Sequence, residues 1–400
     1  MSEANFDGLS LKIIHVLRAP LGGLFRHVLD LTREQVARGH QVGLITDSLT
    51  GGDRATTILN ELAPSLALGL SRVPMHRNPH WSDISALAHV VRRVNDCKPD
   101  IVHGHGSKGA AYARIPVLLG LRGGAIRAYT PHGGSFNHNP GSTLHRIYMG
   151  VEGVLNYATD IFLFESAFIG SCFHKYVGNV RGMERVVLNG ISDAEFAPVP
   201  ANADRADFVY VGELRSAKGI DTLIDAIAEV GRRTGRKPRA VLVGSGPDEA
   251  YLTARAKDCG LQDQISFPGV MPARCAFAQG RVLVVPSRAE SLPYVVLEAA
   301  GGRMPMISTN VGGIPEIFGP FADRLIPCND VDALTRAMIT EIERPATELA
   351  ARAEDVGAFV QGRFGIGHMT DAVLAGYADA LAAYRGSAAP SDGRVAAAAR

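Results

Sequence analysis

Two glutamates with seven residues between them, Glu290 and Glu298, stand in the stretch AESLPYVVLEAAGGRMPMISTNVGGIPE. Glu290 follows a short apolar run that predicts a strand, and Glu298 lies within the next helical pattern. The N–H groups at the start of a helix can hold a phosphate, and carboxylates accept hydrogen bonds from hydroxyls. The spacing therefore suits a nucleotide sugar, with Glu290 at the sugar and Glu298 at the ribose.

Two cations, Arg215 and Lys218, follow the predicted strand DFVYVGEL. Ligands of open α/β sheets bind at the carboxyl ends of the strands, where a diphosphate would gain charge-assisted hydrogen bonds from both side chains. On its own the loop would be interpreted as two solvated cations.

Two glycine-rich turns, Gly22-Gly23 and Gly244-Ser245-Gly246, each separate a predicted strand from a predicted helix. Such a turn can bind phosphate, although glycine there more often relieves steric crowding. Neither turn matches GxGxxG, which argues against a dinucleotide dehydrogenase.

All histidines except His368 lie before residue 200. His132, in YTPHGGSF, is expected at the crest of a loop. His103 and His105 share one face of a strand. A metal site would need a third ligand, and no recognisable one is near, so we expect no metal and a polar lining for a cleft.

The elements that must position these residues are short apolar strands alternating with helical patterns, which predicts parallel sheets covered on both faces. There are two such series, separated by the linker PVPANADRAD. We expect two Rossmann-like domains, and then a helix and a tail. The expected bounds are 1–198, 199–370, 371–385 for a final amphipathic helix, and 386–400 for a disordered tail.

Composition agrees with a two-domain enzyme. The chain has 400 residues, 46% of them hydrophobic, and a formal net charge of +1, which argues against nucleic-acid binding. Its five cysteines are scattered without a CxxC pair, no signal peptide precedes the first strand, and no stretch is apolar enough to span a bilayer. These features indicate a cytoplasmic protein.

Charge is uneven in the first half. Between Asp100 and Glu152 the sequence has no acidic residue but five lysines and arginines: Lys108, Arg114, Arg122, Arg127 and Arg146. On charge alone this is an ordinary solvated surface. The alternative is a basic patch over segment 101–151 that contacts anionic lipid at the membrane or an anionic acceptor.

Taken together, the motifs resemble the retaining glycosyltransferases of family 4, which have the GT-B fold. The resemblance covers nearly the whole chain, through GGLFRHVLDLTREQVARGHQVGLIT, PDIVHGHGSKGAAYARI, YTPHGGSF, VLNGISDAEFAP, VGELRSAKGIDTLIDAI, VLVGSGPDEAYL and VVPSRAESLPYVVLEAAGGRMPMISTNVGGIPE. It implies two Rossmann-like domains facing across a cleft, with the closing helix 371–385 packing toward the first domain. It also implies an acceptor in the first domain, a nucleotide sugar in the second, and no metal requirement.

The resemblance also implies roles for single residues. His132 and Glu290 act at the reacting sugar. Glu298 holds the ribose, and Arg215 and Lys218 hold the diphosphate. The remaining residues expected to contact the nucleotide sugar are Gly22, Gly23, Gly244, Val270, Leu292, Tyr294 and Val295.

Two positions depart from the family pattern. Glu213 stands where an arginine is common, so Arg215 must substitute for it at the diphosphate. Pro293 stands where a glycine is usual and cannot donate a backbone N–H.

The leading hypothesis is a glycosyltransferase that moves a sugar to a lipid-linked or glycan acceptor in cell-surface polysaccharide assembly. The alternatives are a GT-B nucleotide-sugar epimerase or hydrolase, which incubation with donor alone would reveal, and a non-catalytic sugar-nucleotide-binding protein, which would bind without turnover.

Overall fold

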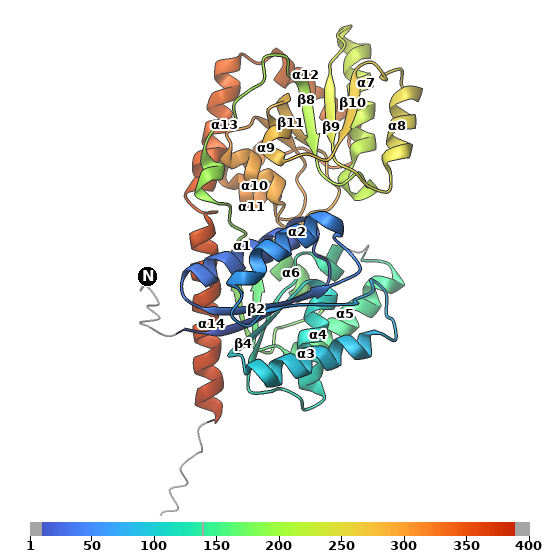
Figure 1. Ribbon diagram of the computed structural model, residues 1–400. Coiled ribbons are helices and arrows are strands. Elements are labelled where there is room, and N and C mark those ends of the chain that lie inside the picture. The colour runs from blue at the N-terminus through green and yellow to red at the C-terminus, as the bar shows by residue number, and fades with distance from the viewer. Residues whose placement is uncertain (1–9, 138–139, 389–400) are drawn as a thin grey trace, which may run out of the picture.

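The computed structural model describes residues 10–137 and 140–388 and shows two lobes connected on one side by a long helix (Figure 1). Each lobe is a parallel sheet with helices packed on it. This arrangement confirms the expected pair of Rossmann-like domains.

The first domain has a seven-stranded sheet in the order β3-β2-β1-β4-β5-β6-β7. Every neighbouring pair is parallel, and the central strands are buried on both faces because helices cover both. The strands are β1 (Lys12–Leu17), β2 (Gln41–Asp47), β3 (Leu70–Val73), β4 (Ile101–His105), β5 (Ile126–Thr130), β6 (Ile161–Phe164) and β7 (Met183–Val186).

Helices of the first domain connect these strands. Ser142 and Ser166 cap α5 and α6 by accepting backbone N–H groups of the first turn. The helices are α1 (Gly22–Ala37), α2 (Gly52–Leu62), α3 (Asp83–Cys97), α4 (Gly106–Leu118), α5 (Thr143–Leu155) and α6 (Ala167–Tyr176).

The second domain has a five-stranded parallel sheet in the order β10-β9-β8-β11-β12. Its strands are β8 (Ala206–Val211), β9 (Ala240–Val243), β10 (Ile265–Gly269), β11 (Gly280–Val285) and β12 (Met306–Ser308). Its helices are α7 (Ile220–Thr234), α8 (Glu249–Asp258), α9 (Ala273–Phe277), α10 (Tyr294–Gly301), α11 (Ile314–Phe318), α12 (Val331–Glu343) and α13 (Ala346–Gln361).

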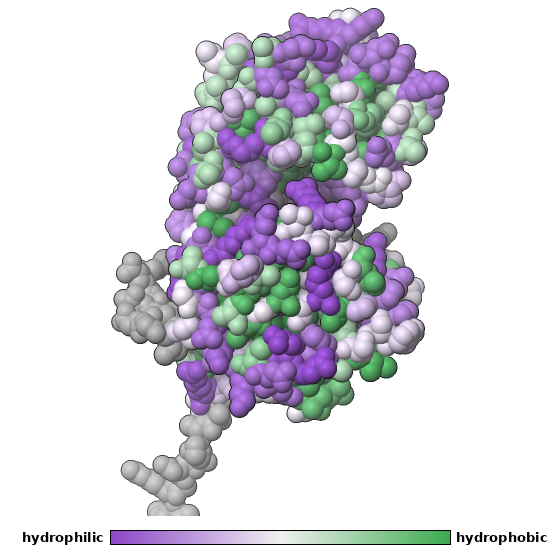
Figure 2. Space-filling view, in the orientation of Figure 1, coloured by the Kyte–Doolittle hydropathy of each residue, from purple (hydrophilic) through white to green (hydrophobic). Residues whose placement is uncertain are grey.

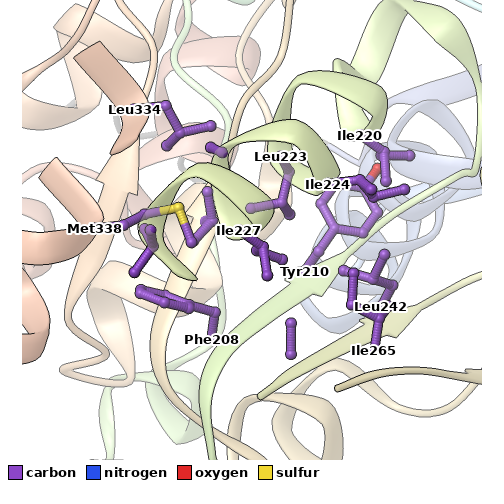
Figure 3. Close-up of a cluster of buried hydrophobic side chains, with 14 of the residues drawn as sticks. Phe208, Tyr210, Ile220, Leu223, Ile224, Ile227, Leu242, Ile265, Leu334 and Met338 are labelled. Atoms are coloured by element: carbon purple, nitrogen blue, oxygen red, sulfur yellow. The ribbon is translucent and has the colours of Figure 1, made fainter. Parts of the chain in front are cut away.

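The core of the second domain shows why the sequence folds in this way. Leu223 and Ile227, on the apolar face of α7, belong to one buried cluster with Phe208 and Tyr210 of β8 (Figure 3). The period of 3.6 on the helix and of two on the strand brings these faces together.

The last helix, α14 (Ile366–Ala388), returns to the first domain. Met369, Val373 and Tyr377 are buried in a cluster with Ile161 and Leu163 of β6. The helix begins five positions before the expected residue 371, directly after Gly365 pairs with Ile191 in an isolated bridge. Most of the expected disordered tail, 389–400, lies outside the described residues.

The expected basic patch over segment 101–151 is wrong. Arg114 and Arg127 are at most 1% exposed. Four of the five cations are satisfied inside the fold: Arg114 by Glu152, Arg127 by backbone carbonyls, Lys108 by Asp83 and Arg122 by Asp160. Only Arg146 of the five remains exposed without a partner in the described part of the chain.

None of the helices within residues 10–388 combines the length and the apolar character that crossing a bilayer requires. Hydrophobic residues nevertheless reach the surface of the lower lobe in several patches (Figure 2).

Candidate active site

Lys218 and Glu290 meet at the carboxyl ends of β8 and β11, which are neighbours in the second sheet. Lys218 Nζ lies 2.7 Å from Glu290 Oε1, and the Ser287 hydroxyl donates to the same oxygen at 2.6 Å. Glu290 is 8% exposed. Its Oε2 receives no hydrogen bond within the described residues and can accept one from a ligand hydroxyl.

Arg215 lies in the same loop as Lys218 but is paired differently. Its Nε is 3.0 Å from a carboxylate oxygen of Glu213, and both side chains are about half exposed. Glu213, which stands where the family commonly has an arginine, thus pairs with Arg215, the residue expected to replace that arginine at the diphosphate. An exposed pair of this kind is weak, so Arg215 can be released to an anion.

A positive φ accounts for Gly22, where a Cβ would meet nothing within 4 Å, and close packing accounts for Gly23 and Gly244. Gly22 has a φ of +63°, and a Cβ on Gly23 would lie 3.3 Å from the ring of Tyr294 in the other domain. A Cβ on Gly244 would lie 1.8 Å from the carbonyl oxygen of Gly212. Backbone contact alone accounts for Gly244, whereas Gly23 sits where the two domains touch.

Glu298, the expected ribose ligand, is held by Arg26 of α1 in an ion pair between the domains. Arg26 also contacts Glu195 at 2.6 Å and lies over the ring of Tyr294. A ribose at Glu298 would have to share that carboxylate with Arg26. The sequence-based reasoning missed Arg26, although its charge one turn after Gly22-Gly23 was an available signal.

Strand register assembles a histidine cluster in the first domain. His15 of β1 pairs in register with His103 of β4, and His105 follows two positions later on the same face. All three are at most 1% exposed. They lie beneath the surface rather than lining a cleft, which corrects the expectation for His103 and His105.

A continuous hydrogen-bonded chain leads from this cluster to His132. Gln35 Oε1 is 2.8 Å from His15 Nε2, His15 Nδ1 is 2.9 Å from His105 Nε2, and His105 Nδ1 is 3.1 Å from His132 Nε2. Burial lowers the pKa of His15 to about 4 and the pKa values of His105 and His132 well below their usual range, so these rings are neutral.

Because the rings are neutral, the chain has a direction. An amide oxygen accepts, so His15 donates from Nε2 and accepts at Nδ1, and His105 and His132 each donate from Nε2 in turn. His132 is left with its lone pair on Nδ1. Its φ of +53° places it in the left-handed region, directly before Gly133 in the loop after β5.

His27 of α1 connects the cluster to the second domain. Asn189 donates to the carbonyl of Leu292 at 2.9 Å, so its Oδ1 accepts from His27 Nδ1 at 3.0 Å. The ring of His27 lies 4.6 Å from that of His132. The Nε2 of His27 is buried without a partner among the described residues.

The expectation that no third metal ligand lies near His103 and His105 is wrong. His15 joins that pair, and His27 and His132 form a second set with His105, with one ligand atom per residue within 4.8 Å of the others in each set. Neutral imidazoles of this kind suit a transition metal. A hydrogen bond between two imidazoles accounts for one short distance in each set, His15 with His105 and His105 with His132, and independence from metal stays a prediction.

Two glutamates that the sequence did not indicate fix segments near the site, the buried Glu165 at the His132 loop and the partly exposed Glu316 at the start of α6. Glu165 accepts from the N–H of Gly133 at 2.6 Å, and burial raises its pKa to about 7. Glu316 of α11 accepts from the N–H groups of Ala167 and Phe168 at the start of α6, both at 2.9 Å. The second domain thus caps a helix of the first.

The remaining predicted contacts differ in accessibility. Leu292 and Tyr294 are 2% and 7% exposed and lie in the core, so Leu292 offers a ligand its backbone rather than its side chain. Val295 is half-buried and Val270 is 60% exposed. Pro293 precedes α10 at its N-cap.

Family models match both domains: Glycosyltransferase Family 4 over residues 21–195 and Glycosyl transferases group 1 over residues 192–357. The putative teichuronic acid biosynthesis glycosyltransferase TuaC of Bacillus subtilis is 30% identical over 72% of this chain and 72% of its own. A GDP-mannose-dependent alpha-(1-6)-phosphatidylinositol monomannoside mannosyltransferase of Mycobacterium tuberculosis is 30% identical over 45% of this chain and 51% of its own.

Among solved structures, Anabaena Alr3699/HepE in complex with UDP superposes with a TM-score of 0.74 at 18% identity, covering 92% of this chain and 100% of its own. That likeness supports the two-domain GT-B fold. With the family models and the sequence relative, it shows that the chain is a GT-B glycosyltransferase of group 1 and family 4.

Proposed function

We propose that this protein transfers a sugar, with retention of anomeric configuration, from a nucleoside-diphosphate donor to a lipid-linked or glycan acceptor in cell-surface polysaccharide synthesis. The donor lies against the second domain and the acceptor against the first. The expected cytoplasmic location is part of the proposal and is supported by free cysteines throughout the described chain.

One observation carries the proposal: the loop that holds Glu290 is connected to His132 by contacts that cross from one domain to the other. The loop from Glu290 to Leu292 reaches His132 through Asn189 and His27, by two hydrogen bonds and one ring contact. Residues from both domains therefore converge on one place, as a transfer reaction between two bound substrates requires.

The relatives support the substrate classes. One is described as acting in teichuronic acid biosynthesis, another as a GDP-mannose-dependent enzyme acting on phosphatidylinositol monomannoside, and a structural neighbour is in complex with UDP. A nucleotide-sugar donor and a polysaccharide or lipid-linked acceptor are therefore the substrate classes that we propose for this chain.

The residues then have separable roles. Lys218 and Arg215 stabilise the charge that develops on the departing diphosphate, which accepts the proton of the acceptor on the same face of the sugar. Oε2 of Glu290 accepts a hydrogen bond from a sugar hydroxyl, and His132 accepts another at Nδ1. No step assigned here uses a metal.

The test has two stages. Nucleoside diphosphates and their sugars are screened by the rise in melting temperature, since a ligand of the folded state raises it. The sugar that binds is then incubated with acceptors, and the anomeric configuration of the product is read by NMR. Retention is the expected result. An inverted product would contradict the mechanism, and release of free sugar from donor alone would favour a hydrolase.

A further inference from the structure

His27, His105 and His132 form a cluster of three imidazoles in the first domain, and the proposed reaction uses only one nitrogen of the last ring. One ring nitrogen from each residue lies within 4.8 Å of the nitrogens from the other two. The ring centroids of His27 and His132 are 4.6 Å apart, and those of His105 and His132 are 5.4 Å apart. Three imidazole nitrogens this close together are a ligand set for a transition-metal ion.

The free lone pair of His27 is the observation that points to a ligand. His27 is 1% exposed, and its Nδ1 donates to Asn189 Oδ1 at 3.0 Å. In the neutral ring the lone pair is therefore on Nε2, and this atom is buried without a hydrogen-bond partner among the described residues. A buried polar atom without a partner costs free energy, so a metal ion that takes this lone pair would stabilise the folded chain.

Two of the three rings are already oriented as metal ligands are. A histidine that binds a metal through one nitrogen characteristically donates its other N–H to a protein acceptor, which fixes the ring. Asn189 accepts this hydrogen bond from His27. His15 accepts it from His105 Nε2 at 2.9 Å, which leaves the lone pair of His105 on Nδ1, 3.1 Å from His132 Nε2.

The neighbouring set of His15, His103 and His105 is a poorer site. The two ring nitrogens of His103 lie 2.7 and 2.9 Å from hydroxyl oxygens, and both nitrogens of His15 are also hydrogen-bonded. All three residues of that set are buried, whereas His132 is partly exposed and gives its own set access to the surface.

We propose that His27, His105 and His132 bind a transition-metal ion of the Zn²⁺ class, and that the bound ion inhibits transfer. The ligand atoms are His27 Nε2, His105 Nδ1 and His132 Nε2. Three protein ligands leave the fourth position of a tetrahedral ion open to water. As the metal binds, the proton on His132 Nε2 moves to Nδ1 of the same ring, so no proton leaves the protein.

Metal binding would reverse the role of His132 at the sugar. Nδ1 of this ring accepts a hydrogen bond in the metal-free protein, but with the proton on it the same atom can only donate. A ring in that state no longer accepts from the sugar hydroxyl. This consequence for transfer rests on the proposed function, whereas binding of the metal does not.

The first experiment titrates the full chain with Co²⁺ in the absence of substrate and follows the intense visible absorption of a tetrahedral Co²⁺ ion. The wild type should develop this absorption, and Zn²⁺ should abolish it by displacement. H27Q removes the ligand with the free lone pair and should weaken binding by more than about tenfold. H103Q is the matched control, because His103 is similarly buried in the same cluster, and this variant should bind like the wild type.

A second ligand variant and a surface variant make the assignment specific. H132N should weaken binding as H27Q does, and asparagine tolerates the left-handed backbone of this loop position, so the variant should fold. H76Q combined with H80Q removes another histidine pair, with ring centroids 4.0 Å apart, and should keep the spectrum. Near-ultraviolet absorption from cobalt bound to thiolate, or a spectrum lost with this pair, would place the ion elsewhere and overturn the proposal.

The second experiment adds Zn²⁺ to the transfer assay. Transfer by the wild type should fall over the concentration range in which the site fills, and EDTA should restore it. Melting temperatures verify folding, and their rise with nucleotide verifies the donor site in each variant. Co²⁺ binding without inhibition by Zn²⁺, or equal binding by the wild type and folded H27Q or H132N, would overturn the proposal. Absence of transfer by the metal-free wild type would instead sink the proposed function and leave the spectral test of the metal site intact.

Discussion

The two domains contribute different kinds of chemical group to the candidate site. The second domain presents paired charges, Lys218 with Glu290 and Arg215 with Glu213. The first domain presents neutral imidazoles, with His132 at the end of a buried chain. A diphosphate needs cations, whereas orienting a sugar hydroxyl needs a fixed acceptor. Lys218 and Arg215 therefore serve the leaving group, and Glu290 and His132 position the sugar from opposite domains.

The imidazole side should make stability strongly dependent on acid. In the unfolded chain His15 and His27 bind protons below pH 6.5, but burial lowers their folded pKa values to about 4. The free energy of unfolding is therefore unaffected by them above pH 6.5 and falls as the pH drops from 6.5 to 4, by roughly 3 kcal/mol for each ring.

Urea titrations across that range measure the effect. Glu165 works in the opposite direction, because its raised pKa of about 7 costs stability as the pH rises from 4.5 to 7. E165Q should remove that cost. The free energy of unfolding of the variant should therefore fall more steeply than that of the wild type as the pH drops. A flat profile between pH 6.5 and 4 would mean that the histidines are not buried neutral.

The charged side should control the departure of the leaving group. K218M removes the cation held at 2.7 Å from Glu290 and should lower kcat/KM for transfer roughly 10²–10³-fold. R215M is the control for charge alone and should lose less, since Arg215 is half exposed and already paired. Equal losses in both variants would remove the distinction between a buried and a surface cation.

Arg26 joins the two sides. R26M leaves Glu195, Glu298 and Asp30 close together without their shared cation, and should cost about 1–3 kcal/mol in the free energy of unfolding by urea. R38M also breaks an ion pair between separated segments, with Asp371 of α14, but that pair is exposed. It should cost less than about 1 kcal/mol.

Losing the fixed direction of the hydrogen bonds between the imidazoles should have the smallest effect on transfer. Q35L removes the oxygen that orients His15 and should lower kcat about tenfold while leaving KM for the donor nearly unchanged. Nitrogen NMR of His132 should then show a mixture of tautomers. T130V removes a hydrogen-bond partner of His103, which does not belong to the hydrogen-bonded series from Gln35 to His132. This variant should leave the spectrum unchanged.

These two sides also differ in how far sequence could predict them. The Lys218 and Glu290 loops follow β8 and β11, so knowing that ligands bind at strand ends was enough to bring them together. The His15 and His103 contact depends on the pairing and register of β1 and β4, which periodicity does not fix. The strands of both sheets and the last helix were predictable from apolar periodicity, whereas the return of that helix to the first domain was implied by the family resemblance.

Contacts between the domains were the least predictable. Arg26 with Glu298 and Glu316 with the start of α6 join residues that are far apart in sequence and depend on how the lobes meet. The prediction of a basic patch over segment 101–151 was wrong for a related reason. Arg114 and Arg127 are buried by their tertiary partners, which local charge in the sequence does not reveal.

The most direct test of the account is a double-mutant cycle between the two domains, with H132A, E290Q and the double variant compared by kcat/KM for transfer. If both residues act on one bound sugar, the double variant should be about as slow as the slower single variant. Losses that multiply, as for two independent sites, would contradict the claim that the charged and the neutral sides serve one substrate.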